Sequence, residues 1–236
     1  MEKLFNVRLA VFAIALFVVS TAERFVTNFI DAVFDIGTEP IIYHAISLVI
    51  LMFLFIAMNF LLKPFIQSNI VNRIAFGKEY AGGRWIEIIT YVDKEGELSH
   101  CSVSDVAYKE DMIGISGRAY RYRKDKFELW YDFETTKSTM RDYKLKYSFE
   151  ADGVGVSYNS EGKLIFESTT NSRPIRYHGY YTDGDGNHKM IEGFLLTKRN
   201  EIKALNKGEK TALYGVVRRL CKEHDIDINI FKDITT

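Results

Sequence analysis

The sequence predicts two N-terminal transmembrane α-helices followed by an all-β domain, an antiparallel meander β-barrel of about eight strands with a C-terminal helix. Three observations lead to this prediction. Two long apolar runs fall within the first 62 residues, period-two alternation dominates the chain from about Lys78 onward, and a helical pattern follows the last alternating segment. We therefore divide the chain into residues 1–77, a two-helix membrane hairpin, and residues 78–236, a ligand-sensing barrel domain.

The second apolar run, Ile41 to Leu62, is long enough to span a bilayer. It contains no Asp, Glu, Lys or Arg, and at roughly 1.5 Å per residue a helix of this length crosses the ~30 Å hydrocarbon core. The first run, Leu9 to Ala22, extends back towards Leu4 and is interrupted only by Arg8. Together the two runs predict a hairpin that crosses the membrane twice.

The charges beside the two runs predict the orientation of the hairpin. Basic residues near the ends of membrane helices stay in the cytoplasm. Lys3 and Arg8 lie on the N-terminal side of the first run, and Lys63 and Arg73 follow the second. The segment between the runs carries four acidic residues against a single arginine. We therefore expect both termini and the barrel in the cytoplasm, with a short acidic loop outside.

Two parts of the hairpin have a second interpretation. Residues 1–22 also fit a cleaved signal peptide, because a basic start and a short apolar core precede the small residues Ser20-Thr21-Ala22. Residues 25–34 place apolar side chains at helical spacing. That pattern is typical either of an interfacial amphipathic helix on the outer face or of an extension of the first membrane helix.

The rest of the chain alternates in the manner of half-buried strands, with turn signals between the segments. We expect strands near 84–92, 97–107, 111–122, 126–134, 140–149, 163–169, 175–183 and 189–197, with a short one at 154–158. The sets expected to share a strand face are Phe127, Leu129, Tyr131 and Phe133, and Tyr143, Leu145, Tyr147 and Phe149. Closure into a barrel leaves no exposed edge, and a barrel of this size can hold one small ligand inside.

A helix is predicted after the last strand. Its apolar residues at helical spacing are Leu213, Val216, Val217, Leu220 and Cys221, and its expected capping pair is Asn206 and Glu209. We expect this helix to plug or flank the barrel. The alternating tail, residues 226–230, is expected to add a short strand.

Composition and motifs narrow the class of function. The 31 basic and 31 acidic residues balance, which argues against bulk binding of DNA or RNA. Cys101 and Cys221 are expected to be free thiols in a reducing compartment. The sequence has no Walker motif, dinucleotide fingerprint, zinc cluster or nucleophile elbow, so we predict no enzyme activity, cofactor or metal. Residues 183–187 begin like a calcium loop, but His188 replaces its obligatory glycine, which favours a hairpin turn.

Arginine and aromatic residues accumulate on the presumed strands and predict a ligand site. Aromatic faces stack on nucleobases, and guanidinium groups bind phosphates through paired hydrogen bonds. Arg118 and Tyr120 share one strand face, Arg176 and Tyr180 share another, and Trp130 lies in a further strand. We predict that these five residues bind the ligand, with arginine on phosphate and a ring on a base. The competing interpretation is that aromatic residues favour strands and arginines face solvent.

Two N-terminal membrane helices, an all-β domain and Gly82-Gly83-Arg84-Trp85 at its first strand occur together in this chain. The stretches Arg176–Asp183 and Met190–Thr197 complete the pattern. With these features the chain resembles the two-transmembrane, β-strand-rich membrane effectors of bacterial CBASS antiphage defence. The resemblance covers nearly the whole chain by architecture, and its motifs are short.

The resemblance implies a function. In that family a nucleotidyltransferase makes a cyclic oligonucleotide on phage infection, the barrel binds it, and the effector self-associates. The membrane helices then breach the inner membrane and kill the cell, which is abortive infection. The implied partners are a cyclic dinucleotide or trinucleotide, the lipid bilayer and further copies of the chain.

Three other classes of function remain open. A membrane-tethered, lipocalin-like carrier or sensor of an apolar ligand would have a pocket lined by Leu, Ile and Phe. A hydrolase acting near the membrane would need catalytic residues that converge only in the fold. An accessory subunit would use the barrel to dock another protein.

Overall fold

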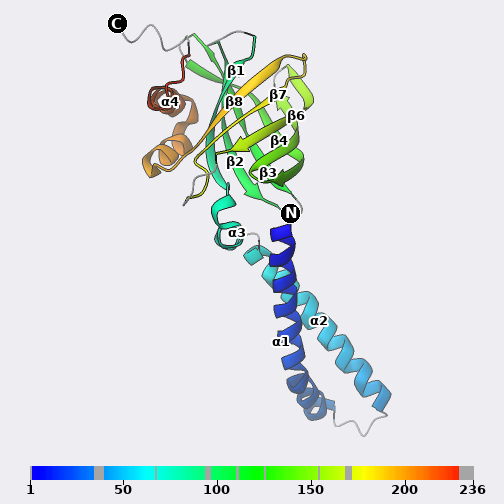
Figure 1. Cartoon of the computed structure of the whole chain (residues 1–236). Coiled ribbons are helices and arrows are strands. Elements are labelled where there is room, and N and C mark those ends of the chain that lie inside the picture. Colours follow the sequence, from blue (N-terminus) through cyan, green and yellow to red (C-terminus); the bar gives the residue numbers. More distant parts are fainter. Residues whose placement is uncertain are drawn as a thin grey trace. The chain divides into compact units, whose positions relative to one another are not determined.

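The computed structural model describes residues 2–34, 40–66, 68–93, 97–109, 112–124, 126–153, 155–167 and 172–228. The chain forms two compact units, Glu2–Ala75 and Phe76–Thr236. Helix α1 (Glu2–Phe34), helix α2 (Pro40–Ile66) and nearly all of helix α3 (Asn69–Phe76) belong to the first unit (Figure 1).

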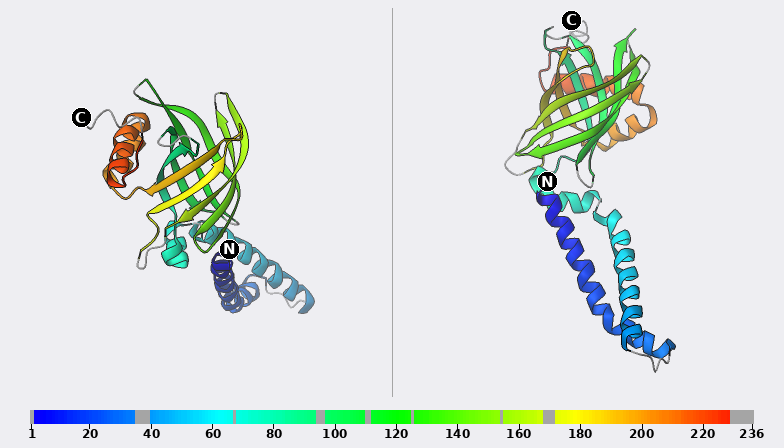
Figure 2. Two further views of the ribbon diagram at one scale, coloured as in Figure 1. Left: turned by 45° about the horizontal axis from the view of Figure 1, so that its top comes forward. Right: turned by 90° about the vertical axis from the view of Figure 1, so that its right-hand side faces the viewer.

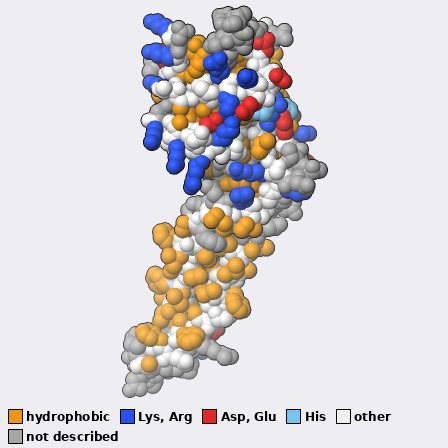
Figure 3. All heavy atoms as spheres, turned by 90° about the vertical axis from the view of Figure 1, so that its left-hand side faces the viewer, with side chains coloured by type: hydrophobic (Ala, Val, Ile, Leu, Met, Phe, Trp, Pro, Cys, Tyr) orange, Lys and Arg blue, Asp and Glu red, His pale blue; other side chains and the backbone are white. Residues whose placement is uncertain are grey.

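Both long helices of the first unit contain a span that is long and apolar enough to cross a membrane, Leu9–Phe29 in α1 and His44–Leu62 in α2. Large apolar side chains on these spans are exposed, with Phe17 at 70% and Phe60 at 77%. Figure 3 shows hydrophobic side chains covering this unit. Apolar surface of this extent is unfavourable in water, which agrees with the predicted membrane hairpin.

Helices α1 and α2 contact each other, and the buried side chains on them include small ones. Ala15 is fully buried and Ser47 nearly so, and the rings of Phe12 and Phe55 meet edge to face with centroids 5.4 Å apart. Small residues let membrane helices approach closely. Because α1 continues unbroken to Phe34, residues 25–34 extend the first helix and do not form a separate interfacial one.

The second unit contains a closed barrel of eight antiparallel strands in sequence order, with β8 paired to β1 (Figure 2). The strands are β1 (Gly83–Tyr91), β2 (Leu98–Tyr108), β3 (Ile113–Arg123), β4 (Lys126–Arg141), β5 (Lys144–Gly153), β6 (Val156–Phe166), β7 (Arg176–Thr182) and β8 (His188–Leu195). The predicted meander barrel is confirmed.

The predicted boundaries of three strands, β4, β5 and β6, are wrong. β5 runs over Lys144–Gly153 and not over residues 140–149. β4 continues to Arg141, and the chain reverses at Asp142 and Tyr143, which have φ values of 49° and 62°. β6 runs through residues 159–162, where the sequence predicted a turn. Gly162 lies opposite Tyr147 on β5, and a Cβ at Gly162 would stand 2.7 Å from Cζ of that tyrosine. This glycine therefore leaves room for the tyrosine ring and does not mark a turn.

A β-bulge in β4 changes which side chains face the barrel interior. Leu129 pairs with Tyr120, but Tyr131 pairs with the preceding residue, Ala119, so Trp130 is the extra residue. Phe127 consequently packs on the outside under the C-terminal helix, whereas Tyr131 lines the interior. The predicted common face for residues 127–133 is wrong because period-two alternation cannot register an inserted residue. In β5 no such insertion interrupts Leu145, Tyr147 and Phe149.

Helix α4 (Arg199–Glu223) flanks the barrel and does not plug it. It begins well before Asn206, so the predicted capping pair lies inside the helix. An apolar layer fills the space between α4 and the outer barrel face, and its members are Ile86, Ile88, Cys101, Val103, Tyr120, Phe127, Phe194, Leu205, Leu213, Val216, Val217, Leu220, Cys221 and Ile228. Both cysteines are free and buried in this layer. Residues 226–228 form no strand, and the rest of the predicted tail strand lies outside the described residues.

Candidate functional site

The proximal end of the barrel, where β1 begins and β8 ends, is closed by packed aromatic rings. Trp85 is fully buried, with its ring centroid 5.7 Å from that of Phe166 and 4.8 Å from that of Tyr177. The Trp85 indole Nε1–H donates a hydrogen bond of 3.0 Å to the carbonyl oxygen of Ala81. No polar group of this indole is left unsatisfied, so the proximal end is a packed core.

A buried carboxylate stands above this aromatic layer. Glu87 is 6% exposed, and its carboxylate accepts hydrogen bonds from the hydroxyls of Ser102, Ser104 and Tyr177. Burial raises the pKa of the Tyr177 hydroxyl well above its ordinary value, which keeps this hydroxyl a donor. These hydrogen bonds satisfy the carboxylate inside the barrel.

A small cavity lies among the described residues in the middle of the barrel. Its volume is about 30 Å³, and its lining includes Glu87, His100, Tyr131, Tyr147 and Tyr181. A cavity of this size holds a water molecule or two, whereas a pocket for a small ligand has roughly 300–1,000 Å³. Large aromatic side chains fill much of the interior around this cavity, and a ligand inside the barrel stays a prediction.

The distal end of the barrel, where β1 ends and β8 begins, carries a polar network around His100. Its Nε2 lies 2.9 Å from the Tyr131 hydroxyl and 3.3 Å from the Tyr181 hydroxyl, and its Nδ1 lies 3.0 Å from the Ser99 hydroxyl. Burial, together with the positive charges of Lys189 and Arg121, lowers the pKa of His100 to about 3. The imidazole is therefore neutral at physiological pH and acts as a hydrogen-bonding group.

Two cations lie beside this network. The Arg121 guanidinium carbon is 3.2 Å from the centroid of the Trp130 ring, and burial followed by the nearby charge of Arg123 lowers the pKa of Arg121. No carboxylate among the described residues forms an ion pair with Arg121. A guanidinium stacked on a ring keeps its in-plane N–H groups available for an anion.

The second cation, Lys189, is 2% exposed. Its Nζ lies 3.3 Å from Asp183 Oδ2 and 3.3 Å from the centroid of the Tyr91 ring. Burial would raise the pKa of the Asp183 carboxyl, but hydrogen bonds from Asn187 and the charge of Lys189 outweigh it and lower that pKa. The same carboxylate accepts backbone hydrogen bonds from Asp185 and Asn187, so residues 183–187 form the predicted hairpin turn.

The structure does not bring the five predicted site residues together. Trp130 lies at the distal end beside His100 and Arg121. Tyr120 is 2% exposed in the apolar layer under α4. The Arg176 guanidinium bonds to the Glu192 carboxylate at 2.9 and 3.1 Å.

Arg118 lies in an outer hollow of about 550 Å³ whose lining includes Arg84 and five acidic side chains, namely Asp105, Asp132, Glu134, Glu150 and Asp152. A cluster of carboxylates repels phosphate. The surroundings of Arg118 therefore disfavour the phosphate contact that the sequence suggested.

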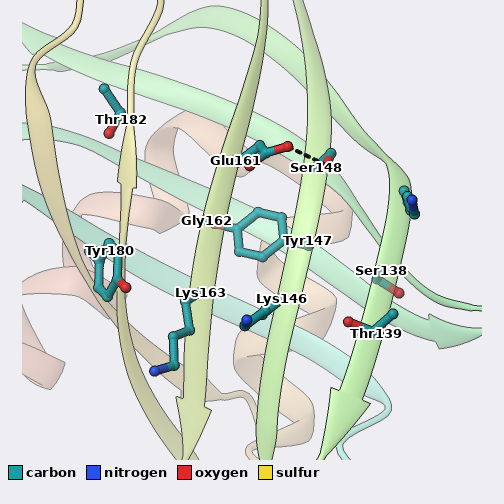
Figure 4. Close-up of a pocket in the computed structure, with 11 residues that line it drawn as sticks. Ser138, Thr139, Lys146, Tyr147, Ser148, Glu161, Gly162, Lys163, Tyr180 and Thr182 are labelled. Carbon is teal, nitrogen blue, oxygen red and sulfur yellow. Dashed lines mark hydrogen bonds between the residues drawn. The ribbon is translucent and has the colours of Figure 1, made fainter.

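Tyr180 lines a second outer hollow, of about 450 Å³, across β4 to β7 (Figure 4). In the strand register Lys146 stands opposite Lys163, and Lys163 stands opposite Tyr180. Like charges that face each other across a sheet are unfavourable unless an anion lies near them. Lys146 is exposed and Tyr180 is 55% exposed, and Glu161 also lines this lysine hollow. Its side chains therefore lie on an open surface.

Sequence reasoning did not select Arg121, His100 or Lys189. Arg121 alternates with Tyr120, and only the fold shows that the face of Arg121 is the inner one. The sequence did contain a signal for Lys189. Lys189 lies two residues before Ile191 and therefore stands on the same, apolar face of its strand. Lysine is seldom buried without a specific role or partner.

No protein-family model matches the chain, and none of the curated proteins matches it. Among solved structures the chain is similar to a redesigned β-barrel, mFAP1, bound to DFHBI. The two chains are 16% identical, the match covers 49% of this chain and 94% of that chain, and the TM-score is 0.35. A likeness this distant bears on neither ligand nor function.

Proposed function

We propose that this chain is a membrane-anchored receptor and effector of antiphage defence. The distal end of the barrel binds a cyclic dinucleotide or trinucleotide, and binding drives self-association of α1 and α2 in a bacterial inner membrane. The assembled helices then disrupt that membrane, as in the CBASS effectors that the chain resembles. Both termini and the barrel lie in the cytoplasm, where such a messenger is made.

The Arg121–Trp130 pair is the observation that carries the choice of ligand class. A guanidinium held flat on a ring offers N–H groups to a phosphate and its free face to a base. The buried His100, hydrogen-bonded to Tyr131 and Tyr181, packs against the Trp130 ring and holds it in place. A cyclic oligonucleotide presents phosphates and bases close together, which fits this combination.

The small volume of the interior cavity disfavours the lipocalin-like alternative. A pocket for a small ligand has roughly 300–1,000 Å³, whereas this cavity has about 30 Å³. Its lining does include the apolar side chains that such a carrier would use, namely Ile89, Ile115, Phe133, Phe149, Leu164 and Ile191. A bound apolar ligand would also require the aromatic side chains of the interior to move apart.

Calorimetry on the full-length protein in lipid nanodiscs tests the ligand class. Cyclic di-AMP, cyclic di-GMP and a cyclic trinucleotide are titrated in parallel with a fatty acid. We expect binding of at least one cyclic oligonucleotide, and a charge-assisted phosphate contact of about 1.5–3 kcal/mol predicts that Arg121→Ala weakens it roughly ten- to a hundred-fold. Binding of the fatty acid alone would reject the proposal.

Two matched variants locate the site. Arg118→Ala removes an arginine from the acidic hollow, and Lys163→Ala removes a cation from the lysine hollow. We expect neither to change the affinity. If Lys163→Ala weakens binding and Arg121→Ala does not, the ligand class stands and the distal end is the wrong site.

Dye release tests the output of the receptor. Vesicles that contain the full-length protein should leak when the bound cyclic oligonucleotide is added, and vesicles with Arg121→Ala should need correspondingly more of it. A reporter fused after Thr236 should read out in the cytoplasm. A periplasmic readout would separate the barrel from any cytosolic messenger and contradict the proposal.

A further inference from the structure

Helix α3 is a separate short helix that follows the second apolar span. α2 ends at Ile66, and α3 starts at Asn69 with its own N-terminal hydrogen bonds. The backbone N–H of Val71 donates to the Ser68 hydroxyl at 3.3 Å, and the backbone N–H of Asn72 donates to the Ser68 carbonyl oxygen at 3.1 Å. A capped start of this kind marks the beginning of a separate helix.

The exposed face of α3 is apolar. Ile70 is 73% exposed and Ile74 is 78% exposed, and residues four apart stand on the same face of a helix. Arg73 is exposed next to them. At the end of α3, the Phe76 ring packs on Tyr108 with centroids 4.3 Å apart. The helix thus exposes two large aliphatic side chains on one face, unlike an ordinary surface helix.

We infer that α3 lies in the interface of the bilayer, with Ile70 and Ile74 inserted between the lipid headgroups and the acyl chains. The helix begins at Asn69, shortly after the end of α2, the helix that contains the span His44–Leu62. Its eight residues give a length of roughly 12 Å, too short to cross the hydrocarbon core. An apolar face with a flanking arginine is typical of a helix that lies in the plane of the membrane.

This assignment depends on α2 being a membrane span and is independent of the ligand proposed for the barrel. A loss of cyclic-oligonucleotide binding would leave it intact. Conversely, a failure of the assignment would leave the ligand site at the distal end of the barrel unaffected.

Spin labels on the full-length protein in nanodiscs test the position of α3. The chain's own thiols, Cys101 and Cys221, are buried and should take up little label, which labelling of the parent protein measures as the background. Labels are placed through Ile74→Cys and, as a second site, Ile70→Cys. Lys210→Cys, on an exposed position of α4, is the matched water-facing control.

A label in lipid collides with dissolved oxygen, and a label in water collides with a nickel chelate. We expect labels at positions 70 and 74 to favour oxygen over nickel several-fold, and the label at position 210 to show the reverse. A label at 74 that favours nickel would place the helix in water. Low collision rates with both reagents would place protein over Ile74, for example a second copy. Either result would overturn the assignment.

Discussion

The two ends of the barrel are built on the same alternating strands but from different side chains. At the proximal end the fully buried Trp85 contacts Phe166 and Tyr177, and its one polar atom is satisfied by Ala81. At the distal end a half-buried ring, Trp130, carries a guanidinium and sits beside neutral hydrogen-bonding groups. A tryptophan is thus used for packing at one end and is available for contact at the other.

This comparison separates stability from recognition within one fold. Side chains at the proximal end have all their partners inside the protein, so removing them should lower the free energy of unfolding. At the distal end Arg121 has a ring below it and no acidic partner among the described residues. Under the proposed function, replacing Arg121 should mainly weaken ligand binding. Chemical unfolding of the full-length protein in detergent micelles measures how each end contributes to stability.

The largest effect is expected from Trp85→Ala. Removing a fully buried indole leaves a cavity against Phe166 and Tyr177 and orphans the Ala81 carbonyl. Such changes cost about 3–5 kcal/mol of the free energy of unfolding. Trp130→Ala is the matched control, and it should cost much less because Trp130 is half-exposed. Equal losses at the two ends would remove the distinction between them.

A smaller effect, about 1–3 kcal/mol, is expected from Gly193→Ala. The Cβ of alanine would stand 2.2 Å from Cζ of Tyr177, so this ring must move and its hydrogen bond to Glu87 must shift. Gly215→Ala is the control, because nothing lies within 4 Å of its Cβ position in α4. There alanine should stabilise the helix by up to about 1 kcal/mol. A neutral Gly193→Ala would show that the interior is loosely packed.

The barrel was predictable from the sequence because the alternating pattern of each strand is a local feature. Leu145, Tyr147 and Phe149 alternate along β5 without interruption, as predicted, whereas Tyr143, predicted on the same face, lies in the turn before this strand. Eight strands in meander order follow from such segments and from their turns. The C-terminal helix was likewise recognisable from its apolar spacing, although not its start at Arg199.

The distal site was not predictable from the sequence because it depends on register. A single inserted residue, Trp130, turns Tyr131 inward while Phe127 stays outside. Period-two reasoning also cannot say which of two alternating faces is the inner one. It therefore favoured Tyr120, which lies under α4, over its neighbour Arg121. The aromatic content of the sequence predicted many rings in the barrel, but it did not indicate which rings would be packed inside and which would be partly exposed.

The distal network should make stability depend on pH. The pKa of His100 is lowered from 6.5 to about 3 in the folded chain. Between these values the unfolded chain binds a proton that the folded chain does not. The free energy of unfolding should therefore fall as the pH drops below 6.5, by up to about 1.4 kcal/mol per pH unit.

Carboxylates also titrate in this range, so His100→Gln is compared with the parent at each pH. The glutamine variant should show a shallower loss of stability between pH 6.5 and pH 4.5, since it lacks the group that is protonated only after unfolding. Identical slopes for the two proteins would mean that His100 gains a proton in the folded state, and that the network at the distal end is open to water.

The smallest effect on stability is expected from Arg121→Met. This variant gives the sharpest test of the difference between the proximal and distal ends. Methionine keeps a long side chain over the Trp130 ring and removes the charge, so the loss is the cation–π contribution of about 0.5–1 kcal/mol. Removing a partly buried positive charge that is destabilised by burial and by Arg123 offsets part of this loss. The unfolding midpoint should therefore change little, while the affinity for a cyclic oligonucleotide falls as in Arg121→Ala. A loss of stability as large as that of Trp85→Ala would show that Arg121 holds the barrel together, and the distal end would then be core like the proximal one.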